Sequence, residues 1–319
     1  MNLENIIMQK KLIALAAASA FTLPVMAQSS VIVYGQMDIG VASLPDGAGH
    51  DVTHVDSALW GDSYIGVKGA EDLGSGLQAV FQVETTLVND DDTGLAGEGR
   101  DTFVGLAGGF GTLVAGYLST PLNNWLADYD ANGSNTFRTS NVNLEWALET
   151  RAGNTVAYVT PDLGGFQGVA FYSLDEKRDI KGDAYGVGLR YDNDAFSAMY
   201  TWHAVNDVVD NHAVGLSYDF GVARITGSYI LNTLEDAALE DESGWNLGVA
   251  VPVGNGTISV GYGQESNIAG VRDNDAQIAS IAYSYDLSKR TMLYAGYRYQ
   301  KPEGEDNTNE FAVGVVHRF

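Results

Sequence analysis

The feature that most constrains the fold is an alternation with a period of two residues, which recurs from about residue 30 to the C-terminus. The segment EFAVGVVHRF at 310–319 shows it well, because large apolar side chains occupy one parity and mostly small or polar side chains the other. Successive side chains of a β-strand point to opposite faces, so the pattern predicts strands with one apolar and one hydrated face. The same alternation is present at 77–84, 185–191, 196–203 and 245–251.

Turn signals of two alternating kinds separate these runs. Seven are short, at 71–76, 110–111, 162–165, 192–194, 220–221, 254–256 and 286–289. Eight are longer, polar and acidic, at about 44–56, 89–99, 120–150, 174–182, 204–210, 233–243, 266–273 and 301–309. Short turns on one side and long loops on the other are typical of an outer-membrane barrel. The sequence therefore predicts an all-β fold, a 16-stranded antiparallel transmembrane β-barrel over residues 28–319, with both ends on the short-turn side.

The alternative to a barrel is a soluble β-sandwich or propeller, whose strands bury their inner faces in a dry core. Here the second face carries glycine, hydroxyl, amide and charged side chains, as at Gln78, Gln82 and Glu84. A water-filled lumen accommodates these residues, and closure of the sheet leaves no unpaired strand edge in lipid. The pattern therefore favours the barrel.

The first 27 residues have the layout of a secretory signal peptide. Lys10 and Lys11 precede an apolar run, LIALAAASAFTLPV, and Ala27 ends a small-residue cleavage site. The run is about 14 residues long, shorter than the roughly 20 that a membrane-spanning helix needs. We expect cleavage after Ala27 and export of residues 28–319, whether translation starts at Met1 or at Met8.

Composition excludes several functions. The chain has no cysteine, which removes disulfide scaffolds and thiolate chemistry. Its 17 basic and 41 acidic residues give a formal charge of −24 and argue against a nucleic-acid partner, because phosphate binding relies on Lys and Arg. The fragment Gly61–Tyr64 superficially resembles a serine-esterase block, but residues 28–319 contain no Gly-x-Ser-x-Gly elbow. We therefore expect no enzyme activity.

Several stretches together resemble the Gram-negative general porins of the neisserial and β-proteobacterial type. The resemblance covers nearly all of 28–319 and implies a homotrimer in the outer membrane that lets small hydrophilic solutes diffuse passively. It also implies contact with outer-membrane lipid and lipopolysaccharide, and recognition of the terminal Phe319 by the assembly machinery. The residues that carry it are SVIVYGQMD at 30–38, IGVKGAEDLGSGL at 65–77, AVFQVE at 79–84, FVGL at 103–106, FGT at 110–112, RAGNTVAYVTPDLGGF at 151–166 and VGVVHRF at 313–319.

The longest loop, 120–150, is suspicious on physical grounds, because structureless loops of that length are uncommon unless they are functional. Pro121 can start a short helix that places apolar side chains of 122–126 on one face. The resemblance implies a third loop folded into the lumen, with carboxylates at the constriction. Our first candidates are Asp128 and Asp130, followed by Glu145 and Glu149. The alternative is a hydrated loop that caps the outside.

Basic side chains on the wall opposite those carboxylates would complete a transverse field that selects ions by charge. Lys68, Arg138 and Arg151 are the favoured candidates, and Arg100 is a further one. Three other arginines either line the lumen or pair with acids on neighbouring strands: Arg190, Arg224 and Arg298.

Two aromatic residues depart from the family pattern. Tyr64 and Tyr117 stand where family members commonly have pore-lining arginines, so we count both among the candidates for the constriction. Because these arginines are absent, we expect a cation-preferring or weakly selective pore. Two alternatives stay open. One is a substrate-specific channel, for example for sugars, with an aromatic slide suggested by Trp125, Tyr129, Tyr64 and Tyr117. The other is a structural or adhesive barrel with a plugged lumen.

No cofactor is expected apart from a structural cation. Two acidic runs in the long loops are candidates to bind Ca²⁺ or Mg²⁺, which would bridge loops or lipopolysaccharide phosphates. They are Asp90, Asp91 and Asp92 in one loop and Glu240, Asp241 and Glu242 in another. The alternative is that these runs only keep a wet surface soluble. A metal at His50 and His54 of the first loop is a weaker possibility.

Overall fold

A computed structural model describes residues 30–45, 51–88, 90, 94–140, 144, 151–174 and 183–319, without the side chains of 95–98. The predicted signal peptide, 1–27, lies outside the described residues. Within them nearly all regular structure is β-strand, as the period-two alternation predicts. None of the described helices has the length and apolar character needed to cross a membrane.

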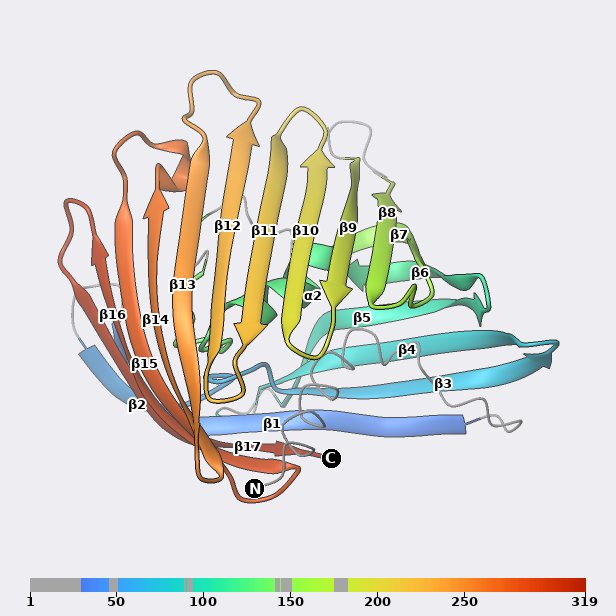
Figure 1. Cartoon of the computed structure of the whole chain (residues 1–319), viewed down its shortest axis with the longest axis horizontal. Helices are drawn as coiled ribbons and strands as arrows, with labels where there is room; N and C mark the ends of the chain where they lie inside the picture. The colour runs from blue at the N-terminus through green and yellow to red at the C-terminus, as the bar shows by residue number, and fades with distance from the viewer. Residues whose placement is uncertain are drawn as a thin grey trace.

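The strands form one closed antiparallel sheet. β1 (Ser30–Pro45) pairs with β17 (Thr308–Arg318) at the far end of the sequence, and from β3 onward each strand pairs with the next one along the chain. Figure 1 shows the two end strands side by side at the base of the curved wall. The strands between are β2 (Asp51–Ser57), β3 (Tyr64–Gly74), β4 (Leu77–Val88), β5 (Gly94–Gly108), β6 (Gly111–Ser119), β7 (Arg151–Val159), β8 (Phe166–Ser173), β9 (Ala184–Asp192), β10 (Phe196–Val205), β11 (Val209–Asp219), β12 (Arg224–Leu234), β13 (Glu242–Val253), β14 (Gly256–Ser266), β15 (Ala276–Asp286) and β16 (Thr291–Pro302).

β2 and β3 together occupy one position in the wall, so the 17 strand segments of the described chain make the predicted 16-stranded barrel. Residues 39–45 of β1 pair with β2, and residues 30–36 pair with β3. The six residues 58–63 therefore lie opposite only Met37 and Asp38 of β1. Leu59 and Ser63 of this segment are buried. We call residues 58–63 the inward bulge; the sequence pattern did not reveal it.

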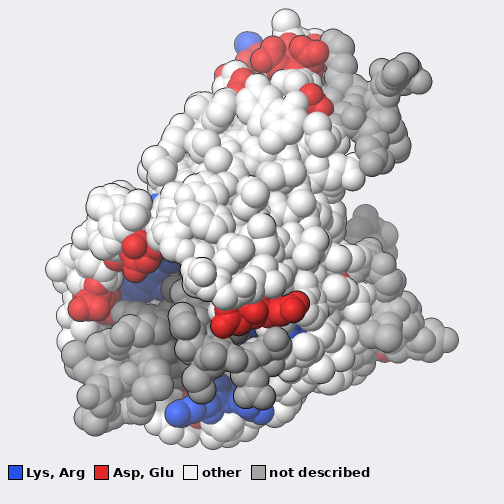
Figure 2. All heavy atoms as spheres, turned by 90° about the vertical axis from the view of Figure 1, so that its right-hand side faces the viewer, with Lys and Arg blue, Asp and Glu red and all other residues white. Residues whose placement is uncertain are grey.

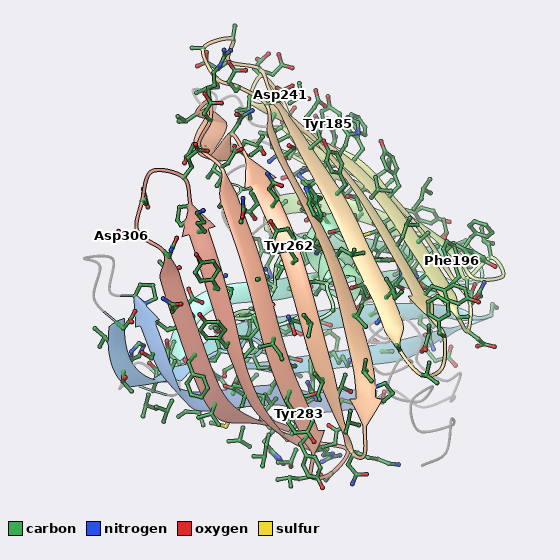
Figure 3. All side chains as sticks on the ribbon, turned by 60° about the vertical axis from the view of Figure 1, so that its left-hand side comes forward. Tyr185, Phe196, Asp241, Tyr262, Tyr283 and Asp306 are labelled. Atoms are coloured by element: carbon green, nitrogen blue, oxygen red, sulfur yellow. The ribbon has the colours of Figure 1, made fainter. Side chains whose placement is uncertain are left out.

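The two faces of the wall differ as predicted. On β9, Leu189 is 59% exposed whereas its neighbour Arg190 is 8% exposed, and on β17 Phe311 is exposed whereas Ala312 is fully buried. Large apolar side chains therefore face outward, and small or polar ones face inward. Figure 2 shows a broad uncharged outer surface below an acidic cluster at the upper end. In Figure 3, Tyr283 and Phe196 lie near the lower ends of their strands and Tyr185 near an upper end, as interfacial aromatics require.

The seven predicted short turns all connect neighbouring strands. Left-handed glycines close several of them, such as Gly221 between β11 and β12 and Gly254 between β13 and β14. One predicted long segment, 204–210, is instead nearly all strand. Only 206–208 lie outside β10 and β11, because Asp207 adopts a left-handed conformation with φ of 57° and makes a tight turn.

The outward face yields the first prediction. Leu247 is 56% exposed near the middle of β13, so Leu247→Arg places a charge in lipid. We expect the free energy of unfolding in lipid vesicles to fall by about 2–4 kcal/mol. The measurement is a denaturant titration of the folded barrel, with Leu247→Met as the matched control. Equal stability of the Arg and Met variants would contradict this assignment of faces.

Candidate pore constriction

The loop after β6 begins with a short helix, as the sequence predicts. α2 (Pro121–Trp125) is preceded by Thr120, whose side chain accepts a hydrogen bond from the backbone N–H of Asn123 at 3.3 Å. Proline at the first helical position costs no hydrogen bond, because that N–H has no partner within a helix. A 3-10 turn, η1 (Leu126–Tyr129), follows directly. We call the described residues 120–140 the loop segment.

The loop segment lies along the inward-facing side of the strands from β9 to β16. Glycines make this close approach possible. A β-carbon added at Gly215 of β11 would lie 2.5 Å from the Tyr129 ring, and one at Gly296 of β16 would lie 2.8 Å from Phe137. Gly188 of β9 receives Trp125 in the same way. At these three glycines, an aromatic ring of the loop segment rests directly on the wall backbone.

Asp128 is tied to the wall by two arginines. Its Oδ2 accepts a hydrogen bond from Arg190 of β9 at 2.6 Å, and its backbone oxygen accepts one from Arg224 of β12 at 2.7 Å. Arg190 also pairs with Asp192. Of the three arginines with two roles left open, Arg298 pairs with Glu310 of the neighbouring strand β17. Arg190 and Arg224 instead bind the loop segment. The Asp128 carboxylate is neutralised by a wall cation, although the prediction assigned it to the opposite side of a transverse field.

Asp130 differs from the prediction more strongly, because it is buried. Its Oδ2 accepts hydrogen bonds from the backbone N–H groups of Thr139 and Ser140 at 2.6 and 2.8 Å, and its Oδ1 accepts one from Asn132 at 2.9 Å. Asn246 of β13 donates to the same carboxylate at 3.3 Å. A buried carboxylate surrounded by donors organises the chain around it. Asp130 therefore fixes the turn of the loop segment and does not present its charge to water.

Two predicted aromatic residues of the loop segment also face the wall. Trp125 and Tyr129 are 3% and 0% exposed. The Tyr129 hydroxyl lies 2.7 Å from Ser197 Oγ of β10. Burial raises the pKa of Tyr129 to about 12, so it stays a neutral phenol at physiological pH. These rings pack against the wall and are not accessible to a solute, so they do not form an aromatic slide.

A cluster of charged and aromatic side chains lines the wall on β1, β3, β4 and β5. Lys68 lies 4.5 Å from the centre of the Tyr34 ring, and the Tyr34 hydroxyl donates to Glu84 at 2.5 Å. Arg100 lies 4.8 Å from the centre of the Tyr64 ring and 3.4 Å from Glu84. The structure thus brings Lys68, Arg100 and Tyr64 to the inward face together.

Arg151 and Tyr117 have different surroundings. Arg151 begins β7 and pairs with Asp101 of β5 at 3.2 Å. Tyr117 shares the parity of the exposed Leu113 on β6, and is itself 38% exposed. The prediction that Tyr117 lines the lumen is therefore wrong: its parity places the side chain on the outward face.

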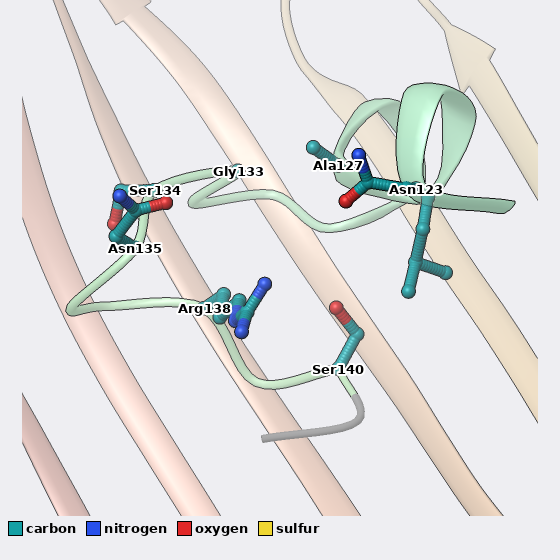
Figure 4. A pocket seen from close by; sticks show the side chains of 8 residues that line it. Asn123, Ala127, Gly133, Ser134, Asn135, Arg138 and Ser140 are labelled. Atoms are coloured by element: carbon teal, nitrogen blue, oxygen red, sulfur yellow. The ribbon is translucent and has the colours of Figure 1, made fainter. Parts of the chain in front are cut away.

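Arg138 is the basic residue that the loop segment itself contributes. It lines a small cavity of about 50 Å³ with Asn123, Ala127 and Ser140, and in Figure 4 its side chain points into that space. Among the described residues it has no hydrogen bond or ion pair, and its Nε is buried without a partner. Burial lowers the pKa of the guanidinium, while Asp130 nearby raises it. Arginine still remains charged, so this cation is incompletely compensated.

The inward bulge contacts the far end of the loop segment, and sequence reasoning missed this contact. Asp62 accepts hydrogen bonds from Asn135 at 2.9 Å and from Arg100 at 2.5 Å. Asn135 also donates its backbone N–H to the Trp60 oxygen at 3.0 Å. The available signal was the fragment around Ser63, which interrupts the strand alternation between β2 and β3.

The three carboxylates of the acidic run at 240–242 each have a different partner. Glu240 pairs with Arg272, Asp241 accepts a hydrogen bond from the Leu234 N–H at 3.1 Å, and Glu242 is buried beside Asn232. Only Glu242 belongs to β13, and Glu240 and Asp241 precede the strand. No group of three or more His, Asp or Glu that could hold a metal occurs in the described parts of the chain. Four other candidates, Asp91, Asp92, Glu145 and Glu149, lie outside the described residues, as does His50.

The sheet is closed, its inward face is polar, and a loop packs along that face. These features together are typical of a bacterial outer-membrane channel. The sequence pattern of the Gram-negative porin family matches residues 14–305, and the chain belongs to that family. It is a multi-pass protein of the outer membrane that crosses with its strands, as the resemblance implied.

Two relatives align over nearly their whole length. Outer membrane porin protein 32 of Delftia acidovorans is 32% identical, with 97% of this chain and 94% of the relative covered. Major outer membrane protein P.IB of Neisseria gonorrhoeae is also 32% identical, with 98% and 100% covered. Among solved structures, the anion-selective porin from Comamonas acidovorans superposes with a TM-score of 0.81 at 28% identity, covering 92% of this chain and 100% of that one.

The burial of Asp130 yields the second prediction. Asp130→Ala leaves three backbone N–H groups of the loop segment without their acceptor, at a cost of about 1–3 kcal/mol for each buried donor. We expect faster cleavage within 131–140 in limited proteolysis of the folded barrel. Asp130→Asn, which keeps an acceptor oxygen, should be cleaved at an intermediate rate. Identical rates for all three proteins would contradict the organising role.

Proposed function

We propose that the protein forms a water-filled channel through which small hydrophilic solutes and ions diffuse passively. The observation that carries this proposal is the loop segment lying along the inward face from β9 to β16, since a loop in that position narrows a lumen without filling it. The experiment is planar-bilayer conductance of the purified protein. Step-like open-channel currents support the proposal, whereas insertion without current indicates the plugged barrel.

The residues assigned to the narrow part are those that approach the passage from both sides. Lys68, Arg100 and Tyr64 belong to the wall, and Arg138 belongs to the loop segment. Asp128 acts there as the partner of Arg190. A sugar-specific slide has little support, because Trp125 and Tyr129 are buried against the wall.

Ion preference has two opposing sources in this proposal. The acidic residues lie mostly in the long loops, and their potential at the outer mouth attracts cations. Arg138 at the constriction attracts anions, and the related Comamonas acidovorans protein is described as anion-selective. Salt screens exposed charges more strongly than partly buried ones, so it weakens the potential of the loop acids more than that of Arg138. The Debye length falls from about 30 Å at 0.01 M salt to about 3 Å at 1 M. Exposed loop charges are therefore screened first. We propose cation preference at low ionic strength, weakening as salt rises.

Reversal potentials measured in salt gradients at several mean concentrations test this prediction. For the native protein, the cation preference at low salt should shrink or change sign toward 1 M. Arg138→Gln should retain more cation preference at high salt. Lys289→Gln, which removes an exposed charge in a short turn, is the matched control. Chloride preference already at low salt would overturn the proposed role of the mouth.

Assembly and targeting complete the proposal. Residues 1–27 act as a cleaved signal peptide, and N-terminal sequencing of the mature protein should begin at Gln28. We propose a homotrimer surrounded by lipid and lipopolysaccharide; one solved neighbour, OmpT of Vibrio cholerae, is described in a trimer form. The C-terminal Phe319, whose backbone pairs with Gly35 at the seam of the barrel, is the proposed signal for the assembly machinery.

A further inference from the structure

We propose that the inward bulge, residues 58–63, is a clasp that holds the far end of the loop segment, with Asp38 as its positioning residue. The proposal rests on the channel function proposed above. Six residues lie opposite Met37 and Asp38, so the ladder of the wall is interrupted there. Buried backbone groups released from a ladder need other partners. The identity of those partners reveals what the bulge does.

Asp38 supplies the partners from the wall side. It is fully buried on β1. Its Oδ2 accepts hydrogen bonds from the backbone N–H groups of Trp60 at 2.5 Å and Gly61 at 2.9 Å, and its Oδ1 accepts one from the Tyr294 hydroxyl at 2.7 Å. Its own N–H donates to Ser63 Oγ at 2.9 Å. One residue thus holds the middle and the end of the bulge and ties both to β16.

The loop segment supplies the partners from the lumen side. The backbone N–H groups of Asn135 and Thr136 donate to the carbonyl oxygens of Trp60 and Leu59 at 3.0 and 2.9 Å. The Asn135 side chain donates to Asp62 Oδ1 at 2.9 Å. In a continuous strand, these bulge carbonyls would instead accept hydrogen bonds from the neighbouring strands. The bulge therefore acts as a short binding edge for the loop.

Aromatic packing and a salt bridge extend the contact. The centre of the Trp60 ring lies 5.3 Å from that of Tyr294 and 6.2 Å from that of Phe137, which is fully buried on Gly296. Asp62, on the other side of the bulge, pairs with Arg100 of the charged wall. A shift of the bulge would therefore move the loop segment and Arg100 together.

Loss of the Asp38 carboxylate removes the acceptor from two bulge N–H groups. The inward conformation of the bulge is then less stable, and the bulge edge that binds Asn135 and Thr136 is weakened. The expected consequence is a loop segment that swings away from the wall more often. Both the width of the passage and the position of Arg100 would fluctuate with it.

A single reporter cysteine tests the clasp directly, because the chain has none of its own. Ser134→Cys places a thiol at a buried position of the loop segment. With Asp38→Ala added, we expect labelling by a charged thiol reagent to become about tenfold faster, since hydrogen bonds to a charged group are lost and local opening is favoured. Asp162→Ala is the matched control. It removes a carboxylate that caps the Gly165 N–H in a short turn away from the loop.

Asn135→Ala provides a second test that leaves the barrel strands unchanged, and it decides the matter if Asp38→Ala does not fold. Both variants should show faster labelling, noisier open-channel current and closure at lower voltage than the reporter protein. If the reporter protein conducts but both variants label and conduct as it does, the clasp is overturned. If the reporter protein itself passes no current, the channel function fails, and labelling still reports on the clasp.

Discussion

The antiparallel pairing of β1 with β17 is the interaction on which the rest of the structure depends. Without it, two strand edges would expose unpaired N–H and C=O groups to hydrocarbon, at several kcal/mol for each group. Registered pairs from Gln36 with Arg318 to Ser43 with Phe311 close the wall. Closure also separates an inside from an outside. Every inward side chain then belongs to one enclosed space, which makes a lumen possible.

Within that space, the distribution of charge differs from a simple arrangement of loop acids against wall bases. The Asp128 carboxylate forms an ion pair with Arg190, and the Asp130 carboxylate accepts hydrogen bonds from the backbone of its own loop. A buried carboxylate without such partners would be costly. Asp128 therefore holds the loop to the wall, and Asp130 holds the turn of the loop itself. Within the part of the chain that the structure describes, the loop instead contributes Arg138, a cation without an ion pair. In the proposed channel, the acids that hold the loop segment and the cation that faces the passage are thus different residues.

The success of sequence reasoning followed the range of the interactions. The strand faces and the short turns depend on neighbours one to four residues apart, so alternation and glycine positions revealed them, as at 310–319 and Gly221. The helix at Pro121 was predictable for the same reason. The bulge was not, because its stability comes from Asp38 and Tyr294, which are far away in the chain. The prediction for Tyr117 was wrong because it relied on the family pattern, whereas the parity of β6 determines which face of the wall the side chain occupies.

The sequence by itself determined that this chain is an outer-membrane barrel with a polar interior, because a period of two with one apolar face satisfies lipid and water at once. It also determined that a long loop follows β6. Only the tertiary structure decided which of the described loop carboxylates are buried and that Arg138 has no ion pair among the described residues. It also decided that residues 58–63 leave the wall to meet Asn135. Those outcomes depend on distant groups meeting in a low-dielectric interior, where an unpaired donor or charge is costly and a well-placed partner decides the conformation.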